Sequence, residues 1–200
     1  MEKLRLAVFA SHEGTNLQAL IDAQKEGQLL AEVVCVISNN SEAGALRRAK
    51  SANIPSYHLS DKMFENVDDY IQALLNILEK HKVDLIVLAG YMKMIPSTII
   101  EKYHHRILNI HPALLPKYGG KGMFGLNVHK AVIEAGEKYS GATVHLVDEE
   151  YDRGKILNQV QVEVMPGDTP ETLAARILPY EHKLYVETIN KIAKKEIILE

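Results

Sequence analysis

The alternation of short β-branched apolar runs with stretches of helical periodicity constrains the fold of this chain more than any other feature. The run at residues 84–90, Asp-Leu-Ile-Val-Leu-Ala-Gly, is apolar almost throughout, as expected for a strand that is covered on both faces. This alternation predicts a single-domain, Rossmann-like α/β fold with a mostly parallel central sheet and helices on both faces. The expected strands are residues 4–11, 32–38, 55–59, 84–90 and 106–111, and the expected helices are residues 15–26, 43–52, 67–78 and a short helix opened by Pro96.

The alternation changes after residue 111. Residues 117–126 contain four glycines and predict a mobile loop, for which a lid over bound ligand and a plain surface loop are both open. The last helix is expected to begin near Thr169-Pro170, an N-cap followed by proline at the first helical position, and Pro179 is expected to kink it. Before that helix we expect a helix at residues 128–137 and β segments at residues 142–147 and 156–164.

Composition narrows the class of protein. With 200 residues, of which 46% are hydrophobic, the chain can fill one ordinary core, and we find no repeat or linker. A net charge of −3 predicts neither a nucleic-acid partner nor a membrane partner, and no apolar run is long enough to cross a bilayer. The first residues run directly into a strand pattern and do not resemble a signal peptide, so we expect a cytoplasmic protein. The single cysteine, Cys35, is expected to be a small buried hydrophobe.

Two polar residues in an apolar strand, Asn109 and His111, are the main candidates for chemistry. Residues two positions apart on a strand share a face, about 6.6 Å apart along it. A carboxamide and an imidazole so placed can hold a small group between them, such as a carbonyl oxygen that becomes an oxyanion. Asp152, if it folds beside His111, would favour the imidazolium and raise the pKa of the ring. The alternative is a hydrogen-bonded polar pair at a strand end, with Asp152 a turn residue.

The loop after the first strand is a second candidate site. Gly14, Thr15 and Asn16 lie where a strand passes into a helix, and backbone N–H groups and the helix dipole at such a point can hold a phosphate. The loop is neither a dinucleotide fingerprint nor a Walker loop. A turn with Thr15 or Asn16 as helix cap is equally open. Glu13 counts against a bound anion unless its side chain points away.

Four segments together resemble one known family. They are Gly-Thr-Asn at residues 14–16, Leu-Ala-Gly-Tyr-Met-Lys at 88–93, Leu-Asn-Ile-His-Pro-Ala-Leu-Leu-Pro at 108–116 and Asp-Arg-Gly at 152–154. In this order they closely resemble the phosphoribosylglycinamide (glycinamide ribonucleotide) formyltransferases of the folate-dependent formyltransferase superfamily. The resemblance implies transfer of the formyl group of 10-formyltetrahydrofolate to the glycine amine of the ribonucleotide in purine biosynthesis, without a metal.

The resemblance also implies roles for single residues. Asn109 and a protonated His111 would donate to the tetrahedral oxyanion, and Asp152 would support the imidazolium and help to move a proton through water. One domain would cover residues 1–200, with a phosphate-binding half to about residue 105 and a catalytic and folate-binding half after it.

Substrate contacts follow from the same resemblance. The ribonucleotide phosphate would lie on the backbone of Gly14, Thr15 and Asn16, and Glu181 would contact the sugar or glycinamide part. Ordinary alternatives stay open: an exposed helix carboxylate for Glu181, core packing for the apolar folate candidates, and a solvated side chain for the lysine among them. The folate pocket would be formed by Met92, Lys93, Met94, Ile95 and Asn109, with the backbone of residues 147–152.

The chain departs from the family pattern at several positions. His12 stands where glycine is usual, which puts a close backbone approach to phosphate in doubt. Lys93 and Val67 replace arginines, so the glutamate tail of the folate would be held differently. Arg153 and Lys155 replace the usual glycine and proline beside the aspartate turn.

Other functions compete with this interpretation. The transfer-RNA formyltransferase, the formyltetrahydrofolate hydrolase and the sugar-nucleotide formyltransferases normally carry a further domain, which we do not find here. A non-catalytic nucleotide-binding module of similar fold is the alternative from a different class, because fold alone does not settle function. The expected partners are glycinamide ribonucleotide and folate, without nucleic acid or membrane, and we expect a monomer or homodimer.

Overall fold

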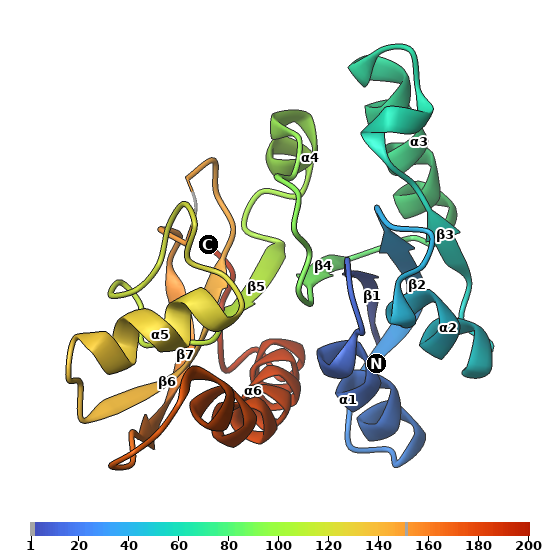
Figure 1. The fold of residues 1–200 in the computed structure, drawn as a ribbon. Coiled ribbons are helices and arrows are strands. Elements are labelled where there is room, and N and C mark those ends of the chain that lie inside the picture. The colour runs from blue at the N-terminus through green and yellow to red at the C-terminus, as the bar shows by residue number, and fades with distance from the viewer. Residues whose placement is uncertain (1–2, 151) are drawn as a thin grey trace.

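A seven-stranded sheet forms the centre of the structure, a computed structural model that describes residues 3–150 and 152–200 (Figure 1). The strand order is β3-β2-β1-β4-β5-β6-β7, with parallel pairing from β3 to β5 and antiparallel pairing of β6 and β7. The mostly parallel α/β fold expected from the sequence is therefore confirmed. The strands are β1 (Leu4–Phe9), β2 (Ala31–Ser38), β3 (Ser56–His58), β4 (Leu85–Leu88), β5 (Ile107–His111), β6 (Tyr139–Leu146) and β7 (Ile156–Glu163).

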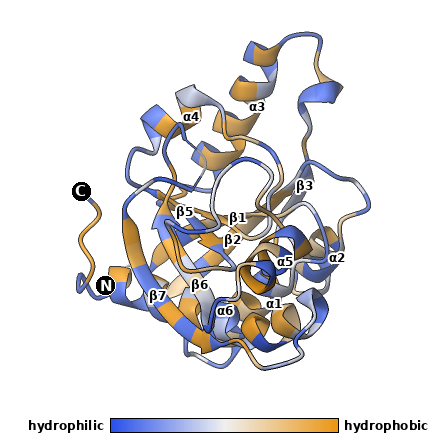
Figure 2. Ribbon diagram, turned by 60° about the vertical axis from the view of Figure 1, so that its left-hand side comes forward, coloured by the Kyte–Doolittle hydropathy of each residue, from blue (hydrophilic) through white to orange (hydrophobic). Residues whose placement is uncertain are grey.

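Helices cover both faces of this sheet. Alternate residues of β1 explain why: Leu6 and Val8 belong to one buried cluster, and Ala7 and Phe9 belong to the other. The first cluster includes residues of α1, α2, α5 and α6, and the second includes residues of α3 and α4. Hydrophobic and hydrophilic residues alternate along the helices in Figure 2, as helices with one buried side require. The helices are α1 (Thr15–Lys25), α2 (Gly44–Ser51), α3 (Val67–Lys80), α4 (Ser97–Lys102), α5 (Leu126–Glu134) and α6 (Pro170–Ala193), with a 3₁₀ turn, η1 (Asp61–Met63).

Element boundaries differ from the sequence expectations mainly in the last part of the chain. The helix expected at residues 128–137 is α5, which begins two residues earlier and ends three residues earlier, at Leu126–Glu134. The β segment expected at residues 142–147 is β6, which starts at Tyr139. β3 is an edge strand of three residues, shorter than the strand expected at residues 55–59. No helix in the described ranges is both long and apolar enough to cross a membrane.

The long helix α6 is held against the sheet by its capping and by one buried tyrosine. Thr169 and Thr172 form a capping box at its start, with Pro170 at the first helical position. The helix continues through Pro179 without ending there. The fully buried Tyr185 hydroxyl lies 2.9 Å from the Leu88 carbonyl oxygen and 3.2 Å from that of Leu108, so α6 is tied to β4 and β5.

The register of the parallel strands brings several loops to one edge of the sheet. Phe9 pairs with Leu88, and Leu88 pairs with Asn109, so β1, β4 and β5 end at nearly the same level. The loops after these strands therefore meet at their carboxyl ends, where ligands of open α/β sheets bind.

Candidate active site

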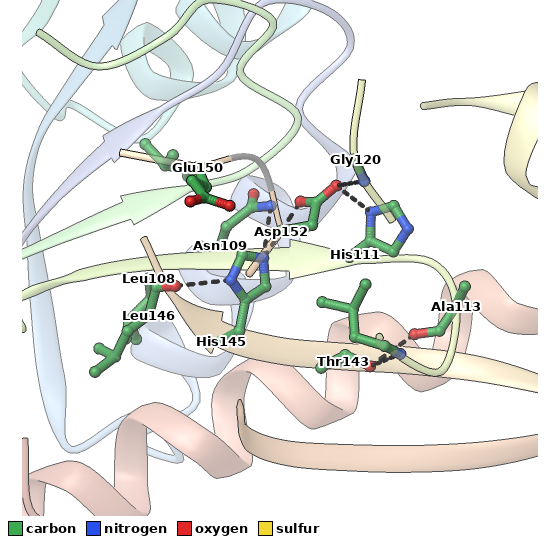
Figure 3. Close-up of polar contacts among 12 residues, drawn as sticks. Leu108, Asn109, His111, Ala113, Gly120, Thr143, His145, Leu146, Glu150 and Asp152 are labelled. Carbon is green, nitrogen blue, oxygen red and sulfur yellow. Dashed lines mark hydrogen bonds and ion pairs between the residues drawn. The ribbon is translucent and has the colours of Figure 1, made fainter. Parts of the chain in front are cut away.

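A polar cluster lies at the end of β5 and is completed by β6 and the turn after it (Figure 3). Asn109 and His111 come from β5. Antiparallel pairing places His145 of β6 directly opposite Asn109. Asp152 reaches the cluster from the connection between β6 and β7, with a left-handed backbone φ of 56°.

The Asp152 carboxylate lies between two imidazole rings. Its Oδ2 is 3.6 Å from His111 Nδ1 and accepts a hydrogen bond from the Gly120 N–H at 2.9 Å. Its Oδ1 is 3.5 Å from His145 Nε2. The structure thus brings together Asn109, His111 and Asp152, the three residues expected from the sequence to act on substrate.

His145 is a member of the cluster that the sequence analysis did not single out. Its Nδ1 lies 2.8 Å from the Leu146 carbonyl oxygen, which can only accept, so Nδ1 carries a proton. In the neutral ring Nε2 accepts from Asn109 Nδ2 at 3.2 Å. A protonated ring can donate from Nε2 to Asp152 instead. Only its position opposite Asn109 on the neighbouring strand identifies His145 as a site residue, and that position depends on the fold.

The expected rise in the pKa of His111 is not observed. Burial of the ring, which is 4% exposed, lowers the pKa of His111 below its usual 6.5, because an imidazolium loses hydration there. Asp152 acts in the expected direction, but its attraction does not outweigh burial. The ring is therefore neutral near pH 7: the predicted effect of Asp152 is present, but burial turns the net shift of the pKa downward.

Both nitrogens of His111 are already engaged. Nε2 lies 2.7 Å from the Tyr118 carbonyl oxygen, so it is the nitrogen that carries the proton, and Nδ1 faces Asp152. Proton gain or loss by the ring consequently occurs at Nδ1. Tyr118 itself has a left-handed φ of 58°, and its hydroxyl donates to Glu137 at 3.0 Å.

The Asp152 carboxyl stays ionised. Burial alone would raise the pKa of Asp152, but its contacts with His145, the Gly120 N–H and the His111 ring together outweigh burial and hold this pKa below its usual value. The cluster therefore combines a fixed negative charge on Asp152 with two imidazole rings beside it.

Two cavities meet at Asn109 and Asp152. The first, which we call cavity A, combines an apolar floor that includes Leu88, Ile95 and Ile100 with an acidic rim at residues 148–150. The second, cavity B, lies beside His111 and is bordered by residues of the glycine-containing loop. A ligand that occupies both cavities would have its middle beside the Asn109 amide and the Asp152 carboxylate. Cavity B is lined by Gly90, Tyr91, Met92, Lys93, Asn109, Ile110, His111, Gly120, Lys121, Gly122, Met123, Phe124 and Asp152.

The other four expected folate residues, besides Asn109, also line these cavities. Met92 lines cavity B, Met94 and Ile95 line cavity A, and Lys93 lines both. Met92 and Met94 are exposed by 42% and 54%, so core packing does not explain them, whereas Ile95 is buried in the core. The Lys93 ammonium lies 3.7 Å from an Asp61 carboxylate oxygen.

The expected nucleotide residues form a separate group next to the same edge of the sheet. Asn16 Nδ2 donates to Glu181 Oε2 at 3.1 Å, and Glu181 is 9% exposed, which excludes a merely exposed helix carboxylate. Burial raises the pKa of Glu181, and the hydrogen bond from Asn16 opposes that rise. Asn16 Oδ1 is buried and lacks a hydrogen-bond partner in residues 3–150 and 152–200.

The start of α1 is open to an acceptor. Gly14, in the left-handed region at φ 72°, is the N-cap and makes no side-chain cap hydrogen bond, so neither Thr15 nor Asn16 acts as the cap. Glu13 lies 3.8 Å from Arg47 of α2, so its carboxylate does not occupy the first turn of α1.

The fold and this cluster define a class of protein. Residues 4–189 match the formyl transferase family, and the chain belongs to that family. Within the described parts of the chain, no group of three or more His, Cys, Asp or Glu side chains is arranged to hold a metal ion.

Individual relatives narrow the comparison further. The chain is 44% identical over 194 residues to the chloroplastic phosphoribosylglycinamide formyltransferase of Arabidopsis thaliana, covering 96% of this chain and 66% of that protein. It is 44% identical over 181 residues to the phosphoribosylglycinamide formyltransferase of Haemophilus influenzae, covering 90% and 83%. Glycinamide ribonucleotide transformylase 1 from Symbiobacterium toebii superposes with a TM-score of 0.91 at 37% identity, covering 99% and 91%. The chain thus spans just under two thirds of the length of its plant relatives.

Proposed function

We propose that this protein is a phosphoribosylglycinamide formyltransferase that uses 10-formyltetrahydrofolate as its formyl donor. The observation that carries the proposal is the Asp152 carboxylate held between His111 and His145, beside the Asn109 amide, where two cavities meet. The names and identities of the relatives support the same substrates.

The chemistry needs a donor for a developing negative charge and a path for one proton. The substrate amine attacks the formyl carbon, a carbon–nitrogen bond forms, and the formyl oxygen becomes an oxyanion. Collapse of this intermediate breaks the bond to the folate nitrogen, which gains the proton that the amine loses. Asn109 Nδ2 has two N–H groups and gives one to His145, so the other can donate to the oxyanion. Removing such a donor typically costs about 2.7–4 kcal/mol of barrier.

His111 has a narrower role than the sequence suggested. Its Nε2 proton is held by the Tyr118 carbonyl, so the ring can donate to an oxyanion only after this carbonyl is released or the ring turns. Without such a movement His111 acts by charge, after taking a proton at Nδ1 beside Asp152. Asp152 can relay a proton between amine and leaving nitrogen through water, because it borders both cavities.

The two substrates would bind on either side of this cluster. The apolar floor of cavity A suits a flat pterin, with Met94 and Ile95 on its wall and Lys93 at its edge. The uncapped first turn of α1 suits the ribonucleotide phosphate. The unpartnered Asn16 Oδ1 and the Glu181 carboxyl suit hydroxyl or amine groups of the same substrate.

A hydrolase is the second candidate. A formyltetrahydrofolate deformylase from Pseudomonas syringae superposes with a TM-score of 0.87, at 26% identity and over 64% of that chain. The higher identities to the transferases favour transfer to an amine over transfer to water. A cytoplasmic location and a monomeric or dimeric state stay predictions, and two of the plant relatives are chloroplastic by name.

The test is an assay of formyl transfer from 10-formyltetrahydrofolate to glycinamide ribonucleotide, with water and transfer RNA as competing acceptors. We expect turnover with the ribonucleotide only, and a loss of at least about 100-fold in kcat for Asp152→Asn. Formate release without ribonucleotide would establish the hydrolase. Nucleotide binding without any turnover would establish a binding module.

A further inference from the structure

Ser11 joins three loops at the carboxyl edge of the sheet. It follows β1 and is 2% exposed. Its hydroxyl donates to Asn39 Oδ1 at 2.5 Å and accepts from the Met92 N–H at 2.8 Å. Its backbone N–H donates to the Gly90 carbonyl at 3.1 Å, and its own carbonyl accepts from Asn40 Nδ2 at 3.2 Å. Every polar group of this residue is therefore used to hold a neighbouring loop.

These bonds act on the loop after β4 from two sides. The Ser11 N–H donates to the carbonyl of Gly90, which has a left-handed φ of 73°, and the Ser11 hydroxyl accepts from the N–H of Met92. Tyr91 lies between these two residues, so its backbone is held on both sides. The bonds from Met92 N–H to Ser11 Oγ and from Ser11 Oγ–H to Asn39 form a continuous chain. Hydrogen bonds in such a chain polarise and strengthen one another.

The loops that Ser11 joins carry different substrates in the proposed function, on which this inference rests. Gly14 and Asn16 lie three and five residues after Ser11 and belong to the proposed ribonucleotide site. Tyr91 lines both cavities, and Met92 begins the proposed folate segment. We propose that Ser11 is a positioning residue whose hydroxyl sets the folate-side loop relative to the nucleotide loop, and thereby sets the affinity for the formyl donor.

Loss of the Ser11 hydroxyl should affect the binding of the two substrates differently, because only the folate-side loop is held by the side chain. Ser11→Ala removes the acceptor of the Met92 N–H but keeps the backbone bonds to Gly90 and Asn40. The folate-side loop is then loosened, whereas the nucleotide loop keeps its own anchor. The hydrogen bonds of Ser11 go to Asn39, Asn40, Gly90 and Met92 and not to Asn109, His111 or Asp152, so the chemical step should be preserved.

Ser38 offers a matched control. It is fully buried at the end of β2, and its hydroxyl also accepts from a backbone N–H and donates to an oxygen, both on Asn40 and both at 3.1 Å. Ser38→Ala therefore removes the same group with the same number of hydrogen bonds, but without a bond to the folate-side loop. Any general loss of stability should be similar in the two variants.

The experiment is steady-state kinetics of full-length wild type, Ser11→Ala and Ser38→Ala with both substrates, alongside thermal unfolding. For Ser11→Ala we expect the KM for 10-formyltetrahydrofolate to rise about five- to tenfold, with the KM for the ribonucleotide and kcat changed less than about twofold. Ser38→Ala should keep all three constants near wild type. Equal KM values for the two variants, or a rise in both substrates' KM together, would overturn the proposal.

A second variant guards against poor folding of Ser11→Ala. Asn39→Ala removes the far end of the hydrogen-bonded chain at a half-buried position and leaves Ser11 in place. We expect a smaller rise in the KM for 10-formyltetrahydrofolate, about two- to threefold. An unchanged KM would count against the proposed role of the hydrogen bonds that link Asn39, Ser11 and Met92. Absence of turnover in the wild type would instead refute the proposed function, so the two failures are distinguishable.

Discussion

Replacing Tyr185 by phenylalanine tests how α6 is attached to the strands that carry the site. The ring is fully buried, and its hydroxyl lies 2.9 Å and 3.2 Å from the carbonyl oxygens of Leu88 and Leu108. Tyr185→Phe keeps the packing of the ring and removes only the hydroxyl. The hydroxyl has one proton, which it shares unequally between the two carbonyl oxygens. In the variant both carbonyl oxygens lose this hydrogen-bond donor.

The expected loss follows from the hydrogen bond and the carbonyls left behind. One net hydrogen bond contributes about 0.5–1.5 kcal/mol, and an unsatisfied buried acceptor costs about 1–3 kcal/mol. Because the Leu108 contact is the longer one, we expect a total of about 1–2 kcal/mol. In a chain of this size that corresponds to a fall in Tm of about 2–8 °C.

The assay is urea and thermal denaturation followed by circular dichroism, with Tyr103→Phe as the matched control. Tyr103 is 5% exposed, but its hydroxyl makes no hydrogen bond to any of the residues described, so its loss should cost less than about 0.5 kcal/mol. Equal stability of Tyr185→Phe and wild type, or an equal loss in the Tyr103→Phe control, would refute the reasoning.

Three further predictions concern other parts of the fold. Burial raises the pKa of the Cys35 thiol to about 12, so a thiol reagent at pH 8 should label it only after denaturation; rapid labelling of the native protein would contradict this. Gly141→Ala should unfold the protein or lower its Tm sharply on heating, because the new Cβ would lie 1.9 Å from the Val160 carbonyl oxygen. Burial lowers the pKa of His111 below 6.5, so the unfolded chain binds the proton more readily and stability should fall as pH drops through and below 6.5. Urea titrations of His111→Gln should show a weaker pH dependence there, and an unchanged profile would argue against that assignment.

The order of elements could be predicted from the sequence because it depends on local periodicity. A strand covered on both faces must be apolar throughout, as in β4, and a helix with one buried side must repeat its apolar residues at helical spacing, as in α3. The edge position of β3 and the capped start of α6 at Thr169 are also local properties. Boundaries such as the start of α5 were less accurate, because glycine-containing segments carry little periodicity.

Only part of the candidate site could be predicted from the sequence. Asn109 and His111 share a strand, so their joint presence in the site follows from their spacing, and the family resemblance added Asp152. His145 belongs with them only because β5 and β6 pair in one particular register, a long-range property. The hydrogen bond between His111 Nε2 and the Tyr118 carbonyl likewise could not be predicted from the sequence, because it depends on how the loop after β5 folds back.

The amino-acid sequence by itself therefore determined the layered α/β architecture and the residue types available for chemistry, because both depend on neighbours along the chain. Only the tertiary structure decided the protonation of His111, where burial outweighs the attraction of Asp152. It also decided the convergence of the three loops on Ser11. Desolvation and cross-loop hydrogen bonds arise from groups far apart in sequence, so no local pattern encodes them.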